Sequence, residues 1–121
     1  MSVRLVVLDT NILVSALLSP NGNPAKIYKM LLTGVLSLAY NADIYEEYHD
    51  VLSRTRLRIP TDDMETVLAV IRQRGKRVDP IPSTNAMPDE DDRIFYDTAK
   101  TAHGYLFSES CDFIKVVLSL L

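Results

Sequence analysis

The segment Val3-Arg4-Leu5-Val6-Val7-Leu8-Asp9 carries the clearest structural signal in the chain. Its apolar run is rich in β-branched residues and nearly continuous, which is typical of a strand buried on both faces of a parallel sheet. Asp9 follows this strand directly. Because ligands of parallel α/β sheets bind beyond the carboxyl ends of the strands, Asp9 is a candidate functional residue. Its alternative role is that of a helix cap, for which aspartate is favoured.

Helices and strands alternate along the rest of the sequence. Turn residues and apolar spacing predict helices over 12–18, 24–33, 42–54, 61–74 and 91–103, and strands over 35–40, 76–81 and 105–107. Thr10 or Asn11 would cap the short first helix. The alternation predicts an α/β sandwich in which helices flank a mainly parallel central sheet. No repeat, linker or low-complexity segment interrupts residues 1–121, which we expect to form a single domain.

Composition narrows the possible functions. The chain has 121 residues, of which 47% are apolar and 24% charged, as in ordinary globular proteins. Its net charge of −3 argues against a protein that holds nucleic acid through bulk positive charge. The single cysteine, Cys111, excludes an internal disulfide and is typical of a reducing cytosol. Polar residues interrupt the apolar stretch over 3–18, so we expect a cytoplasmic protein without membrane association.

Two predicted helices each present one acid at the edge of their buried face. On the helix over 42–54, the apolar residues place Glu47 at this edge, whereas Glu46 and Asp50 point to solvent. The same geometry places Asp92 at the edge of the last helix and Asp97 on its outer side. The alternative is that these acids are ordinary solvated residues of a helix surface and a helix start.

Further oxygen ligands follow the last predicted strand, namely Ser108, Ser110 and Asp112. Carboxylates that converge at one sheet edge repel one another, and they either raise one another's pKa or bind a cation. Oxygen ligands suit Mg²⁺ or Mn²⁺. Such ions promote phosphodiester hydrolysis by activating water and by bridging the attacking and leaving oxygens. An acidic protein can therefore act on RNA.

Four stretches together resemble PIN-domain proteins, and more narrowly the VapC-like toxin components of type II toxin–antitoxin systems. They contain Leu8-Asp9-Thr10-Asn11 within 8–18, Ser19-Pro20-Asn21-Gly22 within 19–24, Glu46-Glu47-Tyr48-His49 within 46–54, and Asp89-Glu90-Asp91-Asp92 within 88–95. The resemblance implies a PIN-like three-layer sandwich and a ribonuclease that cleaves single-stranded RNA with Mg²⁺ or Mn²⁺. It also implies a cognate antitoxin as partner and a homodimer.

The resemblance also implies the residues of the site. The family's catalytic, metal-binding acids fall on Asp9, Glu47 and Asp92, which are the acids that strand position and helix geometry indicate. Asn11 matches a family asparagine, which we expect to orient Asp9 through a hydrogen bond.

The C-terminal part departs from the family pattern. Ser108 can replace the usual threonine, and Ser110 stands where the family has aspartate or asparagine. Asp112 is therefore the expected fourth catalytic and metal-binding acid, supported by Ser108 and Ser110. The apolar residues 116–121 end the chain where relatives usually continue. A closing strand, a partner-binding segment and the remnant of a truncated gene are all open interpretations of this end.

Basic residues gather in the middle of the chain. Seven of the 13 lie between positions 54 and 77: Arg54, Arg56, Arg58, Arg72, Arg74, Lys76 and Arg77. They form either a rim that contacts RNA phosphates around the acids or ordinary basic helix ends.

Two other functions compete with the ribonuclease. One is a catalytically degraded PIN-fold module that binds RNA or an antitoxin, which Ser110 suggests because it replaces an acid or amide. The other is a phosphotransferase or phosphatase with Asp9 as nucleophile. This last hypothesis is the weakest, because its sequence pattern requires a second aspartate where Asn11 stands.

Overall fold

The computed structural model of the chain describes residues 4–84, 86–87 and 90–107. The predictions made for Ser108, Ser110 and Asp112, and those for residues 116–121, concern positions outside this part of the chain.

Within the described residues, four parallel strands form one sheet in the order β3-β2-β1-β4. They are β1 (Arg4–Leu8), β2 (Leu36–Tyr40), β3 (Lys76–Arg77) and β4 (Tyr105–Phe107). In the central strand β1, Val6 is paired with Leu38 on one side and with Tyr105 on the other. The predicted parallel α/β sheet is confirmed. β3 is shorter than the strand predicted over 76–81, and only the N–H of Val78 extends its contact with β2, through a bond to the Tyr40 carbonyl at 2.7 Å.

Five α-helices lie within the described residues. They are α1 (Thr10–Leu18), α2 (Asn23–Thr33), α3 (Ala42–Leu52), α4 (Thr61–Arg74) and α5 (Arg93–Ala102). Two single-turn 3₁₀ helices, η1 (Thr55–Leu57) and η2 (Glu90–Asp92), precede α4 and α5. No helix in this part of the chain is both long and apolar enough to span a bilayer.

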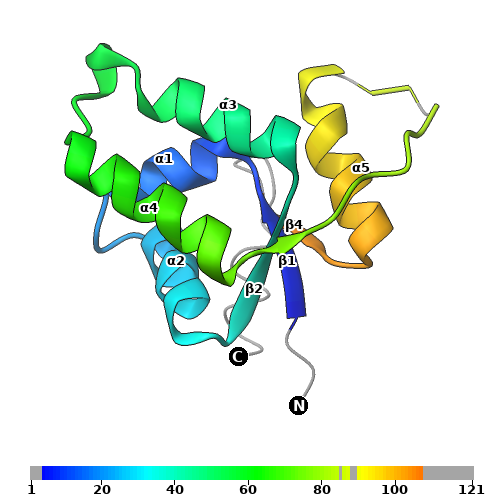
Figure 1. The fold of residues 1–121 in the computed structure, drawn as a ribbon, viewed down its shortest axis with the longest axis horizontal. Coiled ribbons are helices and arrows are strands. Elements are labelled where there is room, and N and C mark those ends of the chain that lie inside the picture. The colour runs from blue at the N-terminus through cyan, green and yellow to red at the C-terminus, as the bar shows by residue number, and fades with distance from the viewer. Residues whose placement is uncertain (1–3, 85, 88–89, 108–121) are drawn as a thin grey trace.

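The helices cover the sheet from two sides. α5 packs against β1, β2 and β4, and it lies to the right of the strands in Figure 1. α2 and α4 pack against β2 from the other side, and α1 packs on α2. This arrangement gives three layers. α3 contacts α1, α4 and α5 and lies above the ends toward which β1 and β2 run (Figure 1), so it closes the carboxyl edge of the sheet.

Several helix boundaries differ from the predictions by one or two residues. α1 begins at Thr10, and its cap is Asp9, whose carboxylate accepts a hydrogen bond from the N–H of Asn11 at 3.0 Å. The predicted caps Thr10 and Asn11 were therefore wrong. α3 ends before Arg54, because the Arg54 N–H bonds to the Val51 carbonyl and tightens the chain into a 3₁₀ turn. The helix predicted over 91–103 likewise begins as the 3₁₀ turn η2.

The core joins β1 to α3. Val6, Val7 and Leu8 are completely buried, as their continuous apolar run predicts. Tyr48 of α3 is also completely buried, and its hydroxyl donates a hydrogen bond to the Leu8 carbonyl at 2.6 Å. The middle of α3 is therefore tied to the last residue of the central strand, one residue before Asp9.

Asn41 joins three segments at the end of β2. Its buried side chain accepts from the N–H of Ile44 at 3.0 Å, as the cap of α3. Its amide donates to the Thr98 hydroxyl at 2.8 Å and to the Val78 carbonyl at 3.2 Å. Loss of this side chain removes a cap and leaves buried polar groups without partners.

Asn41→Ala is accordingly expected to lower the free energy of unfolding by about 2–3 kcal/mol. Urea unfolding followed by circular dichroism measures this change. Asn21→Ala is the matched control, because Asn21 is exposed in the loop between α1 and α2. Equal stabilities of the two variants would contradict the linking role of Asn41.

Candidate active site

A polar pocket of about 260 Å³ lies between α1, α3, η1 and the start of α5. Four carboxylates line it, those of Asp9, Glu47, Asp91 and Asp92. Three of them, Asp9, Glu47 and Asp92, were predicted from the sequence as site residues. The pocket has room for more than a single water molecule. The described chain therefore brings the three predicted acids to one cavity at the carboxyl edge of the sheet.

The position of Asp9 is fixed through its backbone and its side chain. Its N–H donates to the Phe107 carbonyl of β4 at 2.9 Å. Its Oδ1 accepts from the N–H of Asn11 at 3.0 Å. Asp9 is thus both a helix cap and a pocket residue. Asn11 makes this bond with its backbone N–H, so the bond does not depend on an asparagine side chain, and the orienting role expected of Asn11 stays a prediction.

Glu47 is held by a neighbour of Asp9. The Thr10 hydroxyl donates to Oε2 of Glu47 at 2.5 Å, and Thr10 is itself buried. Glu46 and Asp50 are exposed, as the spacing of α3 predicts. Sequence reasoning did not identify Thr10, although its place directly after Asp9 was a usable signal. A hydrogen bond between residues 37 positions apart leaves no trace in local periodicity.

The buried hydroxyl of Tyr48 lies within the electrostatic influence of both carboxylates. Burial raises the pKa of Tyr48 far above its ordinary value, and the charges of Asp9 and Glu47 raise that pKa further. The hydrogen bond to Leu8 opposes these effects only in part. Tyr48 therefore stays neutral and serves as a hydrogen-bond donor that fixes the distance between α3 and β1.

Asp91 and Asp92 reach the pocket from η2. Asp92 was expected on the first turn of the last helix, and instead it immediately precedes α5. Both residues are exposed. Asp91 was not among the site residues predicted from the sequence. The 3₁₀ turn changes the angular spacing between successive residues, and both acids line the cavity.

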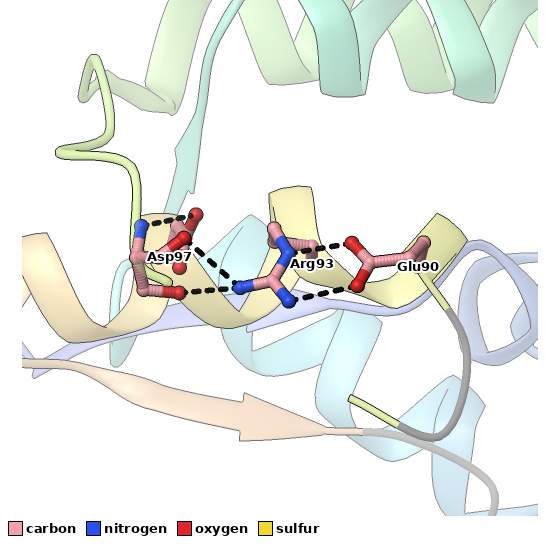
Figure 2. Close-up of polar contacts among 4 residues, drawn as sticks. Glu90, Arg93 and Asp97 are labelled. Atoms are coloured by element: carbon pink, nitrogen blue, oxygen red, sulfur yellow. Dashed lines mark hydrogen bonds and ion pairs between the residues drawn. The ribbon is translucent and has the colours of Figure 1, made fainter. Parts of the chain in front are cut away.

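Asp97 does not point outward as predicted. Only 4% of its surface is exposed, and its Oδ2 accepts from the N–H of Ser83 at 3.2 Å. Figure 2 shows the network around it. Arg93 donates to the carbonyl and the hydroxyl of Ser83, at 3.1 and 2.8 Å, and pairs with Glu90 through two bonds of 2.6 and 2.9 Å. The prediction failed because the segment that contains Ser83 covers the polar side of α5.

The charges of this network affect its pKa values. Burial raises the pKa of Asp97, but the hydrogen bonds of Ser83 and the charges of Arg93 and Lys100 outweigh burial and hold the pKa below its ordinary value. The hydrogen bond and charge of Arg93 lower the pKa of Glu90. One oxygen of Asp97, Oδ1, is buried without a hydrogen-bond partner among the described residues. The network fixes Ser83 and Glu90 on α5 and thereby sets the start of η2.

The donor chemistry of the pocket fits a hard divalent cation, since carboxylate oxygens are the ligands that Mg²⁺ and Mn²⁺ prefer. Within the described residues, no three His, Cys, Asp or Glu side chains lie close enough together to hold a metal ion. Asp112, the predicted fourth acid, lies outside those residues.

The fold is thus a parallel α/β sheet with carboxylates at its carboxyl edge. Residues 5–114 match the family model described as PIN domain, and the chain therefore belongs to the PIN-domain family. PIN domains are generally nucleases, that is, hydrolases, and typically bind divalent metals.

The chain is also similar to a curated protein. The relative, "Uncharacterized protein MJ1680" of Methanocaldococcus jannaschii, is 25% identical over 114 residues, which cover 92% of this chain and 74% of the relative. No solved structure matches the chain with comparable significance.

Proposed function

We propose that this chain is a PIN-type endoribonuclease that hydrolyses phosphodiester bonds of single-stranded RNA with Mg²⁺ or Mn²⁺. The observation that carries the proposal is the meeting of Asp9, Glu47 and Asp92 in one pocket, although they come from three separate segments. Membership of the PIN-domain family supports the same chemistry.

In this proposal Asp9, Glu47 and Asp92 hold the metal, and Asp112 completes its ligands. The bound metal supplies an activated water and neutralises charge on the phosphate. The chain itself orients the carboxylates. The Thr10 hydroxyl donates a hydrogen bond to Oε2 of Glu47, and the Asn11 N–H donates one to Oδ1 of Asp9. The second oxygen of each carboxylate accepts no hydrogen bond from the described residues, and it can serve as a ligand atom.

The proposal extends to the biological role. On the resemblance of the four sequence stretches, we infer a VapC-like toxin that pairs with a cognate antitoxin, forms a homodimer and acts in the cytoplasm. Ser108 and Ser110 would support the ligands from the end of β4. Co-expression with the product of a short neighbouring gene, followed by size-exclusion chromatography, tests the pairing and the dimer together. Elution of the chain as a monomer, separate from this product, would contradict both the antitoxin pairing and the homodimer.

A metal-dependence assay tests the enzymatic proposal. We expect the purified chain to cut a mixed-sequence single-stranded RNA in Mn²⁺ or Mg²⁺, to stop in excess EDTA and to resume when metal is restored. The reason is that the carboxylates alone offer no electrophile for the phosphate charge. Full activity in EDTA would contradict the mechanism. A matched duplex RNA is the control for strand preference.

A degraded PIN module remains the second candidate. It is favoured by Ser110 in the sequence and by the spacing of the described carboxylates, which form no three-residue metal group. Calorimetry with Mn²⁺ separates the two candidates. Heat of binding that Asp92→Asn abolishes supports the enzyme, whereas RNA binding without any metal binding supports the degraded module.

A further inference from the structure

The pocket that holds the four carboxylates has a second, basic side. Arg54, which follows the end of α3, and Arg56, within η1, line the same cavity as Asp9 and Glu47. A phosphodiester chain that approaches four carboxylates is repelled unless positive charge meets it nearby. The two arginines therefore mark a path along which such a chain can approach the acids.

The seven clustered basic residues are not equivalent. Arg72 donates to the Tyr45 hydroxyl at 2.6 Å and lies over its ring, and Arg74 donates to the Leu32 carbonyl at 2.9 Å. Arg77 lies 3.7 Å from Asp79. None of these three arginines lines the carboxylate pocket. The structure thus divides the cluster that the sequence left as a single group.

Arg54 and Arg56 remain available for a ligand. The side chain of Arg56 has no hydrogen bond or ion pair with the described part of the chain. Arg54 lies 3.8 Å from Asp50, and the two side chains are 46% and 77% exposed. An exposed pair of this kind contributes less than about 1 kcal/mol, so a phosphate can replace it.

We propose that Arg54 and Arg56 bind a backbone phosphate next to the scissile one, so that a single strand crosses η1 as it enters the carboxylate pocket. The planar guanidinium groups match phosphate oxygens in a bidentate manner. The assignment rests on the proposed ribonuclease function for the identity of the ligand. It concerns binding and makes its own prediction in the absence of metal.

The test is the salt dependence of RNA binding in EDTA. A fluorescein-labelled single-stranded RNA is titrated with protein at several KCl concentrations, and anisotropy gives the association constant. For Arg54→Ala/Arg56→Ala we expect weaker binding and a logarithmic salt slope shallower by about 0.7, the change for the loss of one phosphate contact on a single strand. The matched control is Arg74→Ala/Arg77→Ala, which removes the same charge outside the pocket and should keep the wild-type slope.

The outcomes separate this inference from the proposed function. An unchanged slope in the pocket variant, an equal loss in the control, or no binding by the wild type at the lowest salt overturns the phosphate assignment. If the slope changes as expected but the wild type never cleaves RNA in Mn²⁺, the assignment stands and the ribonuclease proposal fails. If cleavage occurs and the slope is unchanged, only the assignment fails.

Discussion

Glu47→Gln is expected to lower the rate of RNA cleavage on the order of 100-fold or more, the size of effect seen when a group that stabilises reaction charge is removed. The substitution keeps the shape of the side chain, and the Thr10 hydroxyl can still donate to the amide oxygen. The fold should therefore be preserved while one metal-binding charge is lost. Initial rates at saturating Mn²⁺, with thermal melts of both proteins, measure the effect.

The control for this substitution is its neighbour. Glu46→Gln makes the same change one position earlier on α3, where the side chain is exposed and outside the carboxylate pocket. We expect Glu46→Gln to retain the wild-type rate and the wild-type heat of Mn²⁺ binding. Equal rates for Glu47→Gln and the wild type, or equal losses in both variants, would contradict the role given to Glu47.

The contrast between Glu47 and Glu46 was predictable because α3 has a simple environment. One apolar stripe, with Ile44, Tyr48 and Leu52 buried, defines its inner face, and the helical period then orders the acids. Asp9 was predictable for a similar reason, since a fully buried strand must expose its next polar residue at the sheet edge. In both cases a strong local pattern coincides with the tertiary arrangement.

Asp97 shows where this reasoning stops. The helical spacing of Phe95, Ala99 and Ala102 predicts that they form the buried face of α5, and it places Asp97 on the opposite side of the helix. In the fold, the segment around Ser83 covers that opposite side with polar contacts. α5 is buried on one side by apolar packing and on the other side by hydrogen bonds. Apolar periodicity indicates only the side that packs through apolar residues.

The basic cluster shows a related limit. Seven basic residues close together in sequence predict a positive surface. Their clustering does not show toward which part of the fold each side chain points. Whether an arginine meets Tyr45, a backbone carbonyl or the pocket depends on elements that are remote in sequence. The hydrogen bond from Thr10 to Glu47 is a long-range contact of the same kind.

Arg93→Met is expected to lower the cleavage rate by about 10–100-fold, the usual effect of a residue that orients ligands without binding the reacting group. Arg93 joins Glu90 and Ser83 to α5, and Glu90 begins the turn that carries Asp91 and Asp92 into the pocket. Without this link the turn is free to shift, and the melting temperature should fall. The control is Arg74→Met, whose arginine binds a carbonyl of the remote segment at Leu32.

The pH dependence of stability shows whether Arg93→Met acts by removing the charge of Arg93 from Glu90 and Asp97 or only by removing packing contacts. In the wild type the pKa values of Asp97 and Glu90 are lowered, so the folded state binds fewer protons than the unfolded state as pH falls below the ordinary carboxyl values. Stability from these groups is therefore present above that range and is lost on acidification through it. Arg93→Met removes a cause of both shifts, and its melting temperature should fall less steeply below about pH 4. If the melting temperatures of the two proteins fall in parallel with pH, Arg93 does not lower the pKa values of Asp97 and Glu90. If Arg93→Met cleaves RNA at the wild-type rate, the contacts of Arg93 do not position Asp91 and Asp92.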